Sequence, residues 1–161
     1  MGGAETIAKA QAAFVQAQDA ALASGPLAQM AGWIARGDPP PAAELRAFDL
    51  DGVERGDNAL FLTRNAFHRH WGFSIPCQEA VAGLVGCGPL VEVGAGSGYW
   101  SALLQQAGAD IVATDPTPTG NVGYGFAAGV RFQVLPLDAM AAATRFADRA
   151  VFCSWPTRDA P

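Results

Sequence analysis

Two acidic residues and three glycines are the residues of this chain whose types and spacing could do chemistry. Gly94, Gly96 and Gly98 stand at alternate positions, where the missing Cβ atoms let a backbone turn sharply and approach a ligand closely. Glu92 precedes this turn, and Asp115 follows it after a predicted helix and strand. An acidic side chain at the end of a second strand can accept both hydroxyls of a ribose. The spacing therefore predicts a site for a ribose-containing ligand.

The elements that must position these residues follow from the hydrophobic pattern. Leu90, Val91 and Val93 form a short apolar run that Glu92 interrupts near its end, typical of a central parallel strand covered on both faces. From Ser97 the pattern becomes helical, and Gly108 follows it as a stop signal. Residues 111–114 form a second strand, so the glycine turn and the acidic residue after this strand meet at one edge of a doubly wound sheet. The apolar face of the helix is expected to contain Trp100, Leu103, Leu104 and Ala107.

Two classes of cofactor use this architecture, and the glycine spacing distinguishes them. A dinucleotide fingerprint has the form G-x-G-x-x-G, with the pyrophosphate on the helix N-terminus. In this chain the third glycine comes one residue early, and Tyr99 occupies the sixth place, where a pyrophosphate needs close approach of the helix. The spacing therefore counts against a dinucleotide oxidoreductase.

The segment from Glu92 to Gly98, followed by Asp115, resembles the first two motifs of the Rossmann-like (class I) S-adenosylmethionine-dependent methyltransferases. That cofactor has no phosphate, so the turn needs only to pass beneath its methionine and ribose. The resemblance covers about residues 73–157. It implies that S-adenosylmethionine is held by Glu92, Gly94, Ala95, Gly96, Gly98, Tyr99, Asp115, Pro116, Asp138 and Ser154.

Two of the implied positions leave alternatives open. In the resembling family an acidic residue after the third strand commonly meets the adenine amino group, and Asp138 stands there; it could equally cap the helix that it opens. The loop after the fourth strand faces the transferable methyl group in this family, and here it contains Ser154, Trp155 and Pro156. Some members that methylate amino nitrogens of bases or of Asn and Gln side chains carry Asp or Asn in this loop. This chain has neither Asp nor Asn at that place in the loop, which counts against nucleic acid as the methyl acceptor.

No catalytic triad is expected, because methyl transfer from a sulfonium is an in-line displacement to which a protein contributes mainly positioning and desolvation. The catalytic candidates are Trp155, which could stack on a flat substrate, and His70, which could accept a proton. His68 and His70 are the only histidines, and on a helix they would point about 200° apart, so at most one faces a site. A packed or exposed histidine is the favoured interpretation for each.

The predicted fold class is α/β, a Rossmann-like parallel sheet of about four strands in the order 3-2-1-4, flanked by helices, with an N-terminal helical region. Residues 1–72 form the N-terminal helical region, and residues 73–161 form the partial Rossmann-like domain. A helix over residues 4–23 is expected to rest its weak apolar stripe on the domain, with a dimerisation or lid helix as the alternative. Further helices are expected over residues 57–70 and 76–85.

The last part of the chain supplies the remaining strands. They are expected at residues 132–135 and 150–153, with a helix between them and a functional or flexible loop over residues 116–129. The family's sheet has seven strands in the order 3-2-1-4-5-7-6, so a chain that stops after the fourth strand leaves that apolar strand at an edge. An exposed apolar edge invites pairing with another chain. The alternatives are a homodimer through this edge, cover by the N-terminal helices, or a truncated version of a longer protein, which we favour.

Composition limits the class of partner. The chain has 161 residues, 50% of them hydrophobic and 16% charged, which suits one globular domain with a real core. Its net charge is −5 and Lys9 is its only lysine, so the basic footprint of a nucleic-acid-binding protein is missing. Cys77, Cys87 and Cys153 lack paired or metal-ligand spacing, so no metal is predicted and free thiols in a reducing compartment are expected. No leader or membrane span is visible, which predicts the cytoplasm and no membrane partner.

The sequence therefore predicts a methyltransferase that positions a small molecule or a protein group for in-line methyl transfer from S-adenosylmethionine. The alternative is a non-catalytic S-adenosylmethionine-binding or interaction module, that is, a truncated methyltransferase fragment. Both hypotheses use the same cofactor site.

Overall fold

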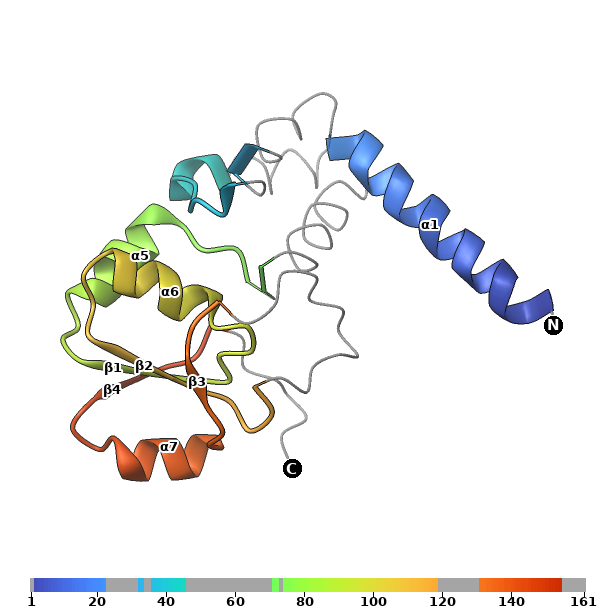
Figure 1. Cartoon of the computed structure of the whole chain (residues 1–161). Helices are drawn as coiled ribbons and strands as arrows, with labels where there is room; N and C mark the ends of the chain where they lie inside the picture. Colours follow the sequence, from blue (N-terminus) through green and yellow to red (C-terminus); the bar gives the residue numbers. More distant parts are fainter. Residues whose placement is uncertain are drawn as a thin grey trace.

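The computed structural model describes residues 2–22, 32–33, 36–45, 71–72, 74–118 and 131–154. These residues include a four-stranded parallel sheet with the strand order β3-β2-β1-β4 (Figure 1). The predicted α/β fold class and strand order are confirmed, and the sheet is compatible with a Rossmann-like fold. The strands are β1 (Leu90–Val93), β2 (Ile111–Thr114), β3 (Val134–Leu135) and β4 (Ala150–Phe152).

β1 lies inside the sheet because β2 and β4 both pair with it in parallel. Leu90 aligns with Ile111 of β2 and with Ala150 of β4, so all three strands start at one edge of the sheet and end at the other. β3 continues the same direction, since it pairs with β2 in parallel. We call the edge where the strands end the carboxyl edge, and the edge where they start the amino edge.

Helices cover both faces of β1, so all four of its side chains are buried, and they point alternately to the two faces. α5 (Gln78–Val85) and α6 (Tyr99–Gln106) lie on one face, and α7 (Ala139–Arg145) lies on the other (Figure 1). Leu90 belongs to the core on the α5 and α6 side, whereas Val91 and Val93 pack with α7. Because side chains alternate along a strand, Glu92 shares the face of Leu90 and is directed at α6.

The apolar face predicted for α6 is wrong at its C-terminal end. Ala107 is exposed and forms the C-cap, followed by Gly108 with a left-handed φ of 95°. The helix instead buries its first turn, including Ser101, against the sheet. A polar side chain can occupy that face because the carboxylate of Glu92 is its hydrogen-bond partner.

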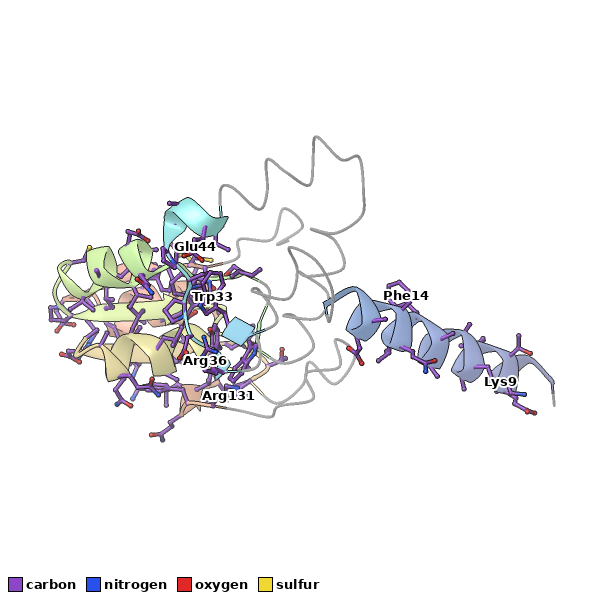
Figure 2. All side chains as sticks on the ribbon, turned by 90° about the horizontal axis from the view of Figure 1, so that it is seen from above. Lys9, Phe14, Trp33, Arg36, Glu44 and Arg131 are labelled. Carbon is purple, nitrogen blue, oxygen red and sulfur yellow. The ribbon has the colours of Figure 1, made fainter. Side chains whose placement is uncertain are left out.

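The N-terminal helix is confirmed, but the surface expected to cover it is not. In α1 (Gly2–Leu22) the side chains of Ile7 and Phe14 are 62% and 48% exposed. The helix lies apart from the sheet in Figure 1 and in Figure 2, where Lys9 and Phe14 mark it. The expectation that its stripe rests on the domain is therefore wrong. An alanine-rich stripe offers little apolar area, so its burial would contribute little free energy. Over the described residues, no helix combines the length and apolar character needed to cross a membrane.

Part of the predicted organisation is not tested by this structure. The predicted helix over residues 57–70, most of the loop over residues 116–129, and Trp155 lie outside the described residues. The domain division at residue 72 stays a prediction. Residues 36–45 contact α5, since Gln78 donates its backbone N–H to the Pro40 carbonyl at 3.0 Å.

Candidate functional site

β1 ends in a turn whose three glycines all have left-handed backbone angles. The φ angle is 70° at Gly94, 55° at Gly96 and 73° at Gly98, a region that residues with side chains rarely adopt. A Cβ atom at Gly94 or Gly96 would meet nothing within 4 Å, whereas one at Gly98 would lie 2.6 Å from Cβ of Phe132. The first two glycines therefore leave space beside the backbone for a ligand, and the third permits close packing.

Hydrogen bonds tie this turn to the end of β2. Ala95 donates its N–H to the carbonyl of Thr114 at 3.0 Å, and Gly98 donates to the carbonyl of Ala95 at 2.8 Å. Between them, the N–H of Gly96 donates to Oδ2 of Asp115 at 2.9 Å. The glycine turn and the acidic residue after β2 are thus in direct contact, as their spacing predicted.

Asp115 lies at the carboxyl edge between the glycine turn and β3. It is 6% exposed, and its own N–H donates to the carbonyl of Leu135 at 3.0 Å. Its Oδ1 accepts from the N–H of Thr117 at 2.8 Å and lies 3.5 Å from the Thr117 hydroxyl. A carboxylate offers about four lone-pair positions, so Asp115 keeps capacity for a further donor such as a ligand hydroxyl.

Glu92 is buried beneath the same edge, with only 1% of its surface exposed. The Ser101 hydroxyl donates to Oε2 at 2.6 Å, and the Ser154 hydroxyl donates to Oε1 at 3.4 Å. Burial raises the pKa of Glu92 most, hydrogen bonds from Ser101 and Ser154 lower it, and the charge of Asp115 adds a smaller increase, which together bring it from 4.5 to about 7. Glu92 therefore exchanges its proton near neutral pH.

Among the described residues, no basic side chain forms an ion pair with either carboxylate. The ion pairs found among the described residues join Glu5 to Lys9, Asp38 to Arg36 and Asp110 to Arg149, and none involves Glu92 or Asp115. Both side chains are buried, so the charge of Asp115, and that of Glu92 when it is ionised, acts more strongly than it would at the surface. The carboxyl edge is thus suited to a cation.

Three segments that are distant in sequence converge on the start of α6. The Ser97 hydroxyl donates to the carbonyl of Trp71 at 2.6 Å, and the N–H of Arg131 donates to the carbonyl of Ser97 at 2.7 Å. The Tyr99 hydroxyl donates to the carbonyl of Gly37 at 2.8 Å. The Arg131 guanidinium, labelled in Figure 2, lies 3.6 Å from the centre of the Trp71 ring. These contacts hold the end of the glycine turn.

The structure brings together only some of the residues that the sequence singled out. Glu92 contacts Ser154, and Gly96 contacts Asp115; Ala95 lies within the turn, and Pro116 is exposed beside it. Tyr99 is the first residue of α6 and is buried, and burial raises the pKa of its phenol, so it remains a hydrogen-bond donor.

Asp138 acts as the cap of α7. It is exposed, and its Oδ1 accepts from the N–H of Ala141 at 2.8 Å. The capping interpretation is confirmed, whereas an adenine contact stays a prediction. The catalytic candidates His70 and Trp155 lie outside the described residues.

Sequence reasoning missed four residues of the site. Thr117 could have been found, because the side chain of an Asp in a turn commonly accepts from the backbone N–H two residues further along the chain. Ser101 was a polar residue within a predicted buried helix, which is a weaker signal. Trp71 and Arg131 carried no local signal, because their partners are 26 and 34 residues away in the chain.

Comparison of this chain with models of protein families, with characterised proteins and with solved structures gave no match. The geometry and charge of the carboxyl edge are therefore the observations that bear on function.

Proposed function

We propose that this protein binds S-adenosylmethionine at the carboxyl edge and transfers its methyl group to a small molecule or a protein group. The observation that carries the proposal is the glycine turn beside Asp115, which combines open space at Gly94 and Gly96 with a carboxylate on the neighbouring strand. In the proposed complex Asp115 accepts the ribose hydroxyls, and the turn passes beneath the methionine and the ribose.

The charge of the site supports this cofactor over a dinucleotide. S-adenosylmethionine carries a positive sulfonium, which the charges of Glu92 and Asp115 would attract. The same two carboxylates would repel a pyrophosphate. Tyr99 adds to this preference, because its buried ring fills the place where a dinucleotide needs the helix to come close.

The proposed chemistry asks little of individual catalytic groups. The cofactor supplies an activated methyl carbon, and the protein would align the acceptor with it and exclude water. His70 and Trp155 remain the proposed catalytic candidates. A cytoplasmic location belongs to the same proposal, and it is supported by three free cysteines, which suit a reducing compartment.

A non-catalytic binding or interaction module is the second candidate. It is favoured by the edge position of β4, whose Val151 is 57% exposed. An exposed apolar edge strand is a surface on which a second copy could add its own strand. Light scattering on the native chain and on Val151→Lys would test this homodimer. If two copies pair through β4, the native chain should be a dimer and the lysine variant a monomer.

Calorimetric titration with S-adenosylmethionine, S-adenosylhomocysteine and NADH at equal concentrations tests the cofactor class. We expect saturable binding of the first two alone, weakened in Glu92→Ala and Asp115→Ala. Asp148→Asn is the matched control, because Asp148 is an exposed carboxylate at the amino edge. Binding of NADH alone, or unchanged affinity in both site variants, would contradict the proposal. Transfer of a labelled methyl group then separates an enzyme from a binding module.

A further inference from the structure

The last contacts between β1 and β2 differ from the ladder that precedes them. Backbone pairing of the two strands runs from Leu90 with Ile111 to Val93 with Thr114, and the bond from Ala95 to the Thr114 carbonyl follows it. The next N–H of the turn, that of Gly96, donates to the side chain of Asp115, whose own N–H donates to the carbonyl of Leu135 on β3. A side-chain carboxylate therefore holds the turn beyond the last backbone contact between the two strands.

We infer that Asp115 is also a positioning residue, whose carboxylate holds the glycine turn in its binding geometry before any ligand arrives. This inference deepens the proposed function, and its consequence for cofactor affinity rests on that function. The consequence for the turn itself does not, because the bond from Gly96 to Asp115 joins two groups of the chain itself.

The turn needs such a contact because three glycines have unusual conformational freedom. Glycine loses more backbone entropy on ordering than any other residue, so a glycine turn keeps one shape only when contacts hold it. An amide that donates to a carboxylate forms a charge-assisted bond, about twice as strong as a neutral one. Asp115 is itself held by Thr117 on its other oxygen, so it can transmit the position of β2 to the turn.

The same carboxylate would thus serve both the turn and the ligand. If Asp115 bound only ribose, its loss would affect only ligands that contain ribose. If it also positions the turn, its loss weakens binding of a ligand that meets the turn but lacks ribose. S-methylmethionine has the sulfonium, amino and carboxylate groups of the cofactor without its nucleoside, and it separates the two roles.

Amide hydrogen exchange measured by NMR tests the inference without any ligand. In the native chain we expect Gly96 to be protected, and in Asp115→Ala we expect its exchange to rise roughly tenfold or more, as for a lost hydrogen bond to a charged group. Ala95 is the internal control, because its N–H bonds to the backbone of Thr114. Asp115→Asn should give an intermediate rate, since one amide oxygen can accept from Gly96 or from Thr117 but not from both. Asp148→Asn should leave Gly96 unchanged.

An unprotected Gly96 in the native chain would overturn the inference, and this measurement needs no variant to fold. An equal rise at Ala95 and throughout the sheet would overturn it too, because Asp115 would then stabilise the whole domain. For binding, parallel losses of affinity for S-adenosylmethionine and S-methylmethionine in Asp115→Ala support the inference, and a loss confined to S-adenosylmethionine contradicts it. Failure of the native chain to bind S-adenosylmethionine would reject the proposed function alone, because the exchange result stands by itself.

Discussion

β2 is flanked by an aspartate at each end, and the two are used in opposite ways. At the amino edge, Asp110 forms a two-pronged ion pair with Arg149, at 2.8 Å and 3.1 Å. The same guanidinium lies 3.3 Å from the Leu90 carbonyl, so it joins the starts of three strands. At the carboxyl edge, Asp115 accepts backbone amides, and no described Lys or Arg contacts it.

This difference distinguishes an aspartate whose charge stabilises the fold, Asp110, from one whose charge is available to a ligand, Asp115. An ion pair that is closed within the protein has little charge left for a ligand. A carboxylate held by backbone amides and a hydroxyl, with no described cation against it, has a fixed direction and can still attract a cationic ligand, and the buried Glu92 adds a second acid nearby. The carboxyl edge is also where ligands bind in open parallel sheets. The amino edge should therefore tolerate changes that abolish binding at the carboxyl edge.

Glycine substitutions should show the largest difference between the edges. Gly98→Ala forces a left-handed residue with a side chain and places its Cβ 2.6 Å from that of Phe132, so we expect a loss of about 3 kcal/mol in unfolding free energy. Gly108→Ala, next to the amino edge, has a φ of 95° but open space, and should cost about 1 kcal/mol. Urea unfolding measures both. Equal losses would mean that packing against Phe132 is unimportant.

Glu92 should make stability depend on pH. Its folded pKa of about 7 exceeds its ordinary value of 4.5, so between these pH values the folded protein holds a proton that the unfolded chain has released. Stability is then fully present below pH 4.5 and falls by about 3 kcal/mol as the pH rises through 7. Glu92→Gln keeps an acceptor for Ser101 and should lose this dependence. Urea unfolding at pH 5 and pH 8 checks it, and parallel changes in both proteins would refute the assignment to Glu92.

Under the proposed function, the same proton should affect binding of a cation. A sulfonium near the carboxyl edge favours ionised Glu92, so affinity for S-adenosylmethionine should fall roughly fivefold between pH 7 and pH 6. S-adenosylhomocysteine has a neutral sulfur and should show a smaller change. Calorimetry in buffers of different ionisation enthalpy would count the released proton. Glu92→Gln should remove the difference between the two ligands, and its persistence would place the responsible group elsewhere.

The smallest effect is expected at the amino edge. The Asp110 side chain is 63% exposed, and ion pairs at such positions contribute at most about 1 kcal/mol. Asp110→Asn should therefore reduce the unfolding free energy only slightly and, under the proposed function, leave the affinity for S-adenosylmethionine unchanged. Denaturation and calorimetry on one preparation would test both statements. A clear loss of affinity would show that the two edges are coupled.

Much of the fold was predictable because its signals are local. Both β1 and β2 match the predicted apolar runs, and the left-handed angles at Gly94, Gly96 and Gly98 match the glycine spacing. β3 and β4 were found within one or two residues at their ends. The exposure of α1 was not predicted, because periodicity shows that a helix has an apolar stripe but not whether anything covers it.

The sequence alone was enough to place two carboxylates and a glycine turn at one edge of a parallel sheet, because an apolar run predicts a strand, and glycines predict a turn, from a few neighbouring residues. The partners of those groups depended on the assembled fold. Ser101 and Ser154 reach Glu92 from α6 and from the end of β4, and Trp71, Gly37 and Arg131 reach the turn from remote segments. The raised pKa of Glu92 has the same origin, because desolvation is set by everything that surrounds a side chain, whatever its distance in the sequence.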